Sequence, residues 1–144
     1  MTVQSILKNK SSNILTVKPS QTLHDVVKIL NEHKIGAVIV TSADQAVLGI
    51  ISERDIVRAL AKNDSPNILN ETVAQHMTHK VMTCKQATPI SQVMEIMTAG
   101  KFRHVPVVEQ DRLIGIISIG DVVKKRLADI EAEHDALRTY IATA

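Results

Sequence analysis

The chain has 144 residues, 44% of them hydrophobic, which fits one compact domain or two small repeats that share a core. A formal net charge of +2 gives no broad basic surface for DNA or an anionic membrane, and one Phe, one Tyr and no Trp leave few aromatic faces for stacking on single-stranded nucleic acid. The single cysteine excludes an internal disulfide, and no apolar run resembles a signal peptide or a membrane span, so we expect a soluble cytoplasmic protein.

The first predicted elements precede a central pair of strands. Residues 3–7 are expected to form a short helix that caps one end of the molecule, and residues 15–17 a short strand. An amphipathic helix follows, opened by a capping box at Thr22 to Asp25. Its apolar stripe consists of Leu23, Val26, Val27 and Leu30.

Two β-rich runs come next, at Ala37 to Thr41 and Val47 to Ser52, separated by turn-forming residues. A second helix is expected directly after Ser52. The resulting β-α-β-β-α unit is too small to cover both faces of its own sheet, so it needs a partner. The polar stretch from Asn63 to Asn70 is predicted to be a linker.

The same pattern returns in the second half of the chain. Ile14 to Leu60 aligns with Val81 to Arg126 with one deletion, so that Thr16 meets Thr83. The second copy predicts a first strand at Met82 to Cys84 and two further strands at Val105 to Val108 and Leu113 to Ser118. Its amphipathic helix has an apolar stripe that consists of Ile90, Val93, Met94 and Met97.

A heptad-like seam follows the second copy. Its members step by four and three along a predicted helix, at Val123, Leu127, Ile130, His134, Leu137 and Ile141. The spacing favours either a helix that pairs with a second copy or a protein partner, or a helix that packs on its own domain, and the sequence leaves both open.

Each copy carries a Gly-h-h-Ser-x-x-Asp motif (h is hydrophobic), at residues 49–55 and 115–121. The motif resembles the Gly-h-h-Thr/Ser-x-x-Asp signature of CBS domains, which are named for cystathionine β-synthase. Val73 to Thr78 resembles the usual lead-in of such a domain, and Phe102 to Val108 resembles its basic, proline-bearing strand. The resemblance covers about residues 2–127.

The resemblance implies an α+β fold in which two β-α-β-β-α repeats pack sheet to sheet with pseudo-two-fold symmetry, followed by a C-terminal helix. We place repeat 1, with the N-terminal helix and the start of the linker, at residues 1–66, repeat 2 at 67–127 and the helical extension at 128–144. Such pairs present two clefts for AMP, ATP, NAD or S-adenosylmethionine, commonly dimerise into a flat disc, and regulate an attached or partnered enzyme or transporter.

The motif has a physical rationale for nucleotide binding. A strand that opens directly into a helix presents free backbone N–H groups and a positive dipole end, and an aspartate one turn later suits both hydroxyls of a ribose. Arg54, Arg103 and His104 are candidates for pairing with phosphate. Ser-x-x-Asp is equally a capping box, and the two roles can coexist.

The two clefts are not expected to be equivalent, because basic and proline residues of the second copy replace small residues of the first. We therefore expect sites that differ in affinity or ligand preference. The expected nucleotide-binding residues are Thr16, Gly36, Ala37, Val38, Ser52, Arg54, Asp55, Thr83, Arg103, His104, Val105, Pro106, Ser118 and Asp121.

No catalytic set is found in the sequence. His76 and His79 with Cys84 do not match a zinc pattern, and Cys84 is expected to be a buried thiol rather than a nucleophile. The expected function is a non-catalytic sensor of energy or redox state that binds AMP, ATP or NAD/NADH, forms a homodimer and acts on a protein effector. The alternative is a structural interaction module whose clefts stay empty.

Overall fold

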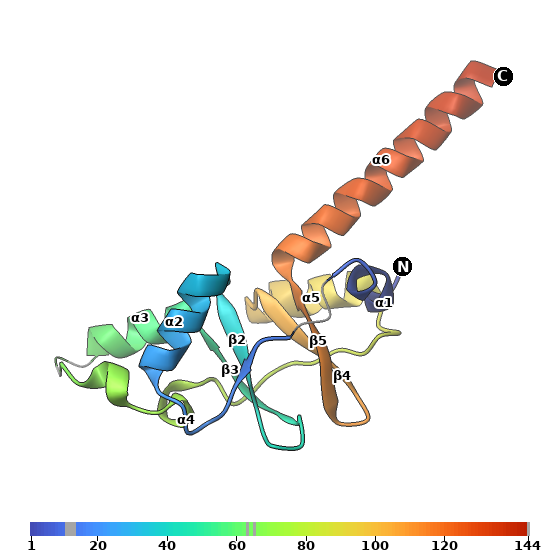
Figure 1. Cartoon of the computed structure of the whole chain (residues 1–144). Coiled ribbons are helices and arrows are strands. Elements are labelled where there is room, and N and C mark those ends of the chain that lie inside the picture. The colour runs from blue at the N-terminus through green and yellow to red at the C-terminus, as the bar shows by residue number, and fades with distance from the viewer. Residues whose placement is uncertain (11–13, 63, 65, 144) are drawn as a thin grey trace.

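The computed structural model describes residues 1–10, 14–62, 64 and 66–143. The elements run in the order α1 (Val3–Leu7), β1 (Thr16–Val17), α2 (Leu23–His33), β2 (Ala37–Thr41), β3 (Val47–Ser52), α3 (Glu53–Lys62), η1 (Ile68–Asn70), α4 (Val73–His76), α5 (Ile90–Gly100), β4 (His104–Glu109), β5 (Arg112–Ser118) and α6 (Ile119–Thr143). Figure 1 shows two halves side by side, with α6 projecting from the second. The expected α+β fold is confirmed. None of the described helices combines the length and apolarity needed to cross a bilayer.

The sheets follow the predicted strands closely. Among the described residues, the first half has the strand order β1-β2-β3, with β1 parallel and β3 antiparallel to β2, and the second half has the antiparallel pair β4-β5. The strand predicted at residues 82–84 is wrong. Only Cys84 pairs there, through its N–H to the Pro106 carbonyl and its carbonyl to the Val108 N–H, both at 2.9 Å.

The predicted helix boundaries rest on local signals that the structure bears out. The Thr22 side chain accepts from the Asp25 N–H at 3.2 Å, and the Asp25 carboxylate accepts from the Thr22 N–H at 3.1 Å, which is the expected capping box. At their ends, α2 and α5 stop at Lys34 and Lys101, both in the left-handed region, with φ of 53° and 57°. The two repeats therefore share even their helix stops.

The described buried side chains form two clusters, one in each half. The first contains Leu23, Val26, Val38, Val40, Ile51 and Ile56, among others. The second contains Ile90, Val93, Val105, Val107, Ile117 and Val122, among others. Both cores are almost wholly aliphatic, as the scarcity of aromatic residues requires.

Helix α1 precedes the first half in the sequence but packs on the second half. Val3 and Ile6 are buried in the second cluster, although sequence order places them with the first repeat. The Val3 N–H donates to the Thr88 carbonyl at 2.9 Å, and the Ile90 N–H donates to the Met1 carbonyl at 3.1 Å. We call residues 1–10 the first lead-in segment.

The stretch before the second repeat does the reverse. Val73 of α4 and Ile68 of η1 are buried in the first cluster, and the Val73 N–H donates to the Gln21 carbonyl at 2.7 Å. We call residues 66–80 the second lead-in segment. It overlaps the predicted linker, of which Asn63 and Ser65 lie outside the described residues. Each core is thus completed by the segment that precedes the other half.

Helix α6 leaves the body after its second turn, in which Arg126 lines a groove beside α5. Val122 is buried in the second cluster, whereas Val123, Leu127, Ile130, Leu137 and Ile141 are 51–66% exposed. The seam therefore does not pack on its own domain, which answers one of the two possibilities that the sequence left open.

The exchanged packing predicts that truncating α1 weakens the distant half. We expect Val3→Ala to lower the free energy of unfolding by about 2 kcal/mol, because Val3 is fully buried in the second cluster. Urea denaturation measures this value. Gln4→Ala, on the exposed face of the same helix, is the matched control, and equal stability of the two variants would contradict the exchange.

Candidate functional site

A cleft of about 660 Å³ lies between the two halves, within the usual size of small-molecule sites. Both repeats contribute to it, through the start of β2, the junction of β3 and α3, and the segment that joins α5 to β4. Its lining residues are Gly36, Ala37, Ile50, Ser52, Glu53, Arg54, Asp55, Val57, Arg58, Thr78, Gly100, Lys101, Phe102, Arg103 and His104.

Part of the cleft lining is apolar. Ala37, Ile50 and Val57 come from the first half, and Phe102 comes from the second. The Phe102 ring lies where a side chain on Gly100 would stand, so this position requires glycine if the ring is to keep its place. An aromatic ring beside aliphatic side chains forms a surface on which a flat apolar group can lie.

The polar side of the cleft is rich in cations. Arg54, Arg58, Lys101 and Arg103 line it together with the two carboxylates of Glu53 and Asp55. The surplus of positive charge favours an anionic ligand, and guanidinium groups match phosphate oxygens in two-point hydrogen bonds.

Asp55 caps its own helix and also faces the cleft. The Ser52 N–H donates to Asp55 Oδ2 at 2.9 Å, and the Asp55 N–H donates to Ser52 Oγ at 3.4 Å, so the capping interpretation is borne out. The other carboxylate oxygen, Oδ1, accepts a long 3.3 Å bond from the Thr78 hydroxyl, and Arg58 lies 3.9 Å from it. Only these weak contacts hold Oδ1.

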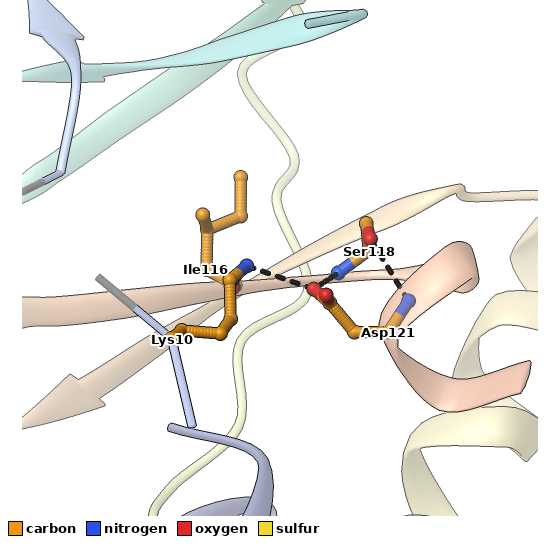
Figure 2. Close-up of polar contacts among 4 residues, drawn as sticks. All are labelled: Lys10, Ile116, Ser118 and Asp121. Atoms are coloured by element: carbon orange, nitrogen blue, oxygen red, sulfur yellow. Dashed lines mark hydrogen bonds and ion pairs between the residues drawn. The ribbon is translucent and has the colours of Figure 1, made fainter. Parts of the chain in front are cut away.

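Asp121 repeats the cap but has a much stronger partner. The Ser118 N–H donates to Asp121 Oδ2 at 2.9 Å, and the Asp121 N–H donates to Ser118 Oγ at 3.1 Å. Figure 2 shows Lys10 reaching across from the first lead-in segment. Its Nζ donates to Asp121 Oδ2 and to the Ile116 carbonyl, both at 2.8 Å. The second motif is therefore engaged by an ammonium group of the same chain.

The electrostatics of this region follow from these contacts. Burial alone would raise the pKa of Asp121, but the hydrogen bonds from Lys10 and Ser118 outweigh it and hold that pKa below its ordinary value. Burial, and then the charges of Lys10 and Arg103, lower the pKa of His104. At neutral pH, His104 therefore offers the cleft a hydrogen-bonding nitrogen and not a charge.

Half of the residues predicted for the site meet in the cleft. These are Gly36, Ala37, Ser52, Arg54, Asp55, Arg103 and His104. The others lie outside it: Val38, Val105 and Pro106 are buried within strands, Thr16 lies in β1, Thr83 is exposed, and Ser118 and Asp121 form the Lys10 site.

Several cleft residues were missed by sequence reasoning. Phe102 and Thr78 stand at the edges of the two stretches that resemble family motifs, so a signal for them was present. Lys10, Arg58 and Lys101 carried no such signal, because only the packing of the halves brings them to the two sites.

The other candidate reactive or metal-binding groups of the sequence, Cys84 and His76, lie outside the cleft. Burial raises the pKa of the Cys84 thiol to about 11, which keeps it protonated and unreactive. His76 Nε2 lies 2.9 Å from the Glu71 carboxylate. In the part of the chain that the structure describes, no cluster of three metal-ligating side chains occurs.

Comparison with known proteins agrees with the fold. Residues 3–62 and 73–128 match the family described as CBS domain. The crystal structure of a CBS-domain containing protein from Agrobacterium tumefaciens is similar, at 48% identity and a TM-score of 0.82, over 88% of this chain and 99% of that one.

Two further similar structures are complexes with adenosine-containing ligands. The protein CBSX2 in complex with AMP is 25% identical, with a TM-score of 0.78, over 88% of this chain and 97% of that one. The CBS domain pair of protein MJ0100, in complex with methylthioadenosine and S-adenosyl-L-methionine, is 26% identical, with a TM-score of 0.78, over 90% and 98% of the two chains.

The Lys10–Asp121 contact predicts a pH-dependent contribution to stability. Because the pKa of Asp121 is lowered in the folded protein, the contact stabilises above the ordinary carboxyl pKa and is lost as the pH falls through the lowered value. We expect Lys10→Met to lower the free energy of unfolding by about 1 kcal/mol at pH 7, and by progressively less below about pH 4. Urea denaturation across this pH range measures it. Exposed Lys8→Met is the control, and identical curves for the two variants would count against the contact.

Proposed function

The chain belongs to the CBS-domain family, and on that premise we propose that it is a non-catalytic regulatory module that binds an adenine nucleotide in the cleft between its halves. The observation that carries the proposal is the cleft itself, whose lining combines the weakly held carboxylate of Asp55 with apolar side chains and a surplus of cations.

Each part of a nucleotide has a matching surface in the cleft. The Asp55 carboxylate suits the ribose hydroxyls, which would replace the long bond from Thr78. The surface formed by Ile50, Ala37 and Phe102 suits the adenine ring, and the guanidinium groups of Arg54 and Arg103 suit phosphate. The two halves would thus hold one ligand jointly.

The charge of the cleft favours a phosphorylated ligand. AMP and S-adenosyl-L-methionine, the ligands named in the two similar structures, share adenosine but differ in charge. The surplus of cations attracts phosphate and repels a sulfonium group. We therefore propose AMP, ATP or NAD/NADH as the ligand, with AMP the first to test because it is the smallest of them.

Regulation would follow from the position of the ligand between the halves. A ligand that contacts both halves favours the arrangement in which those contacts form, and it shifts the population toward that arrangement. We propose that a protein effector reads this shift, so that the chain acts as a soluble cytoplasmic sensor of energy or redox state.

Substitution of Asp55 tests the ribose contact. We expect Asp55→Asn to weaken AMP binding by about tenfold or more, because an amide cannot replace a charge-assisted acceptor. Calorimetric titration measures the affinity. A thermal-shift screen first asks which of AMP, ADP, ATP, NAD, NADH and S-adenosylmethionine binds, since a ligand at about 100 times its Kd stabilises the fold by roughly 2.7 kcal/mol.

Asp25→Asn is the matched control, because Asp25 caps α2 in the same way and lies outside the cleft. Equal losses of affinity in the two variants would trace the effect to helix capping. Stabilisation by none of the six compounds would reject the proposed ligand class and leave an interaction module with empty clefts.

The Lys10 contact predicts the stoichiometry. We expect the wild-type chain to bind one AMP, at Asp55, because Lys10 already satisfies both Asp121 and the Ile116 carbonyl. Lys10→Met frees those two acceptors and should add a second, weaker site, while Lys8→Met should not. Calorimetry gives the molar ratios. Two sites in the wild type would show that Lys10 does not occlude the second motif.

A further inference from the structure

The projecting part of α6 presents an apolar seam to solvent, interrupted by His134. Its members Val123, Leu127, Ile130, Leu137 and Ile141 are all more than half exposed. They occupy the d and a positions of successive heptads, with His134 at one a position. About 30 Å of helix follows Val122, at 1.5 Å per residue. Arg126 still lines a groove beside α5, and Figure 1 shows the helix beyond it standing clear of the body.

The charges beside the seam identify what covers it. With Leu127 at an a position, the charged g positions are Arg126 and Glu133, and the e positions include Glu131 and Arg138. In a parallel two-stranded coil each g residue faces the e residue five positions further along the partner helix. Arg126 then faces Glu131 of a second copy, and Glu133 faces Arg138 of that copy. Both contacts join opposite charges.

One antiparallel arrangement, in which Leu127 packs against Leu137, fails on the same residues. This register places Glu131 opposite Glu131 of the second copy, Glu133 opposite Glu133 of that copy, and Lys124 opposite its Arg138. All three contacts join like charges, which destabilises the pairing. The charges beside the seam therefore favour the parallel pair with a second copy over this antiparallel register.

We propose that the seam of α6 is a homodimer interface, in which the helices of two copies of this chain pair as a parallel two-stranded coiled coil. The two bodies then lie at the same end, side by side about the coil axis. The interface is separate from the nucleotide cleft, so the proposed dimer does not depend on which ligand the cleft binds.

A cysteine cross-link tests the direction of the pair. In a parallel coil Leu137 packs against Leu137 of the second copy, close enough for a disulfide, whereas in an antiparallel coil it lies opposite Leu127. We expect full-length Leu137→Cys to form a covalent dimer under mild oxidation. Ala136→Cys, one position away on the outer face, is the matched control. The native Cys84 is buried. A cross-link from Ala136→Cys as readily as from Leu137→Cys, or from neither, would overturn the parallel pair.

Charge substitutions test the partner contacts in the full-length chain. We expect Arg126→Glu to raise the dimer dissociation constant about tenfold, and addition of Glu131→Arg to restore it, because the second change recreates an opposite-charge pair. Lys124→Glu is the control: its parallel contact is the uncharged Ile119, while its antiparallel contact is Arg138. Sedimentation equilibrium measures the constants. A dimer strengthened by Lys124→Glu and indifferent to Arg126→Glu would show antiparallel pairing.

Leu137→Asp tests whether the seam is the interface at all. Leu137 belongs to neither core cluster, so the variant should keep the unfolding midpoint of the body while becoming monomeric. Circular dichroism with urea checks the fold in the same sample. A wild-type chain that stays monomeric at about 100 µM, or a dimer that survives Leu137→Asp, would refute the proposal.

Discussion

The reciprocal exchange of the two lead-in segments is the contact on which the rest of the structure depends. Val3 enters the second core and Val73 enters the first, and each is held by a backbone hydrogen bond to the receiving half. A repeat this small cannot cover its own sheet, so the missing side chains come from the segment before the other repeat. The exchange fixes the orientation of the halves, and the cleft lies where they meet.

The exchange also explains why the two aspartates of a duplicated motif have different surroundings. Beyond its short helix, each lead-in segment runs past the aspartate of the half that receives it. The second segment brings the Thr78 hydroxyl to Asp55 at 3.3 Å, and the first brings the Lys10 ammonium to Asp121 at 2.8 Å. A neutral donor with a long bond is readily replaced by a ribose hydroxyl, whereas a cation at short range neutralises the carboxylate. The difference between the two sites was expected from the residues of the strands alone. The lead-in segments give a second reason to expect it.

How far the sequence predicted the structure depends on the range of the interaction. The helices α1, α2, α3, α5 and α6, the strands at residues 37–41 and 47–52, and the caps at Thr22 and Ser52 rest on residues close in sequence, and they were predicted correctly. The short helices η1 and α4 were not predicted. The packing of α1 and the Lys10–Asp121 pair, 111 residues apart, depend on the arrangement of the halves, which no local pattern encodes. The strand expected at residues 82–84 was wrong because only Cys84 comes within pairing distance of β4.

Helix α6 joins the second motif to the exposed seam in one rigid element. Its first turn contains Asp121, which Lys10 and Ser118 hold, and Val122, which the second core buries. Because a continuous helix of this length bends little, these base contacts set the direction in which the seam points. Two copies can pair along their seams only if both bases hold the same direction. The Lys10 contact therefore lies where α6 joins the repeats to the proposed coil. A substitution at Asp121 would alter the direction of α6, and so the proposed dimer, without altering the cleft at Asp55.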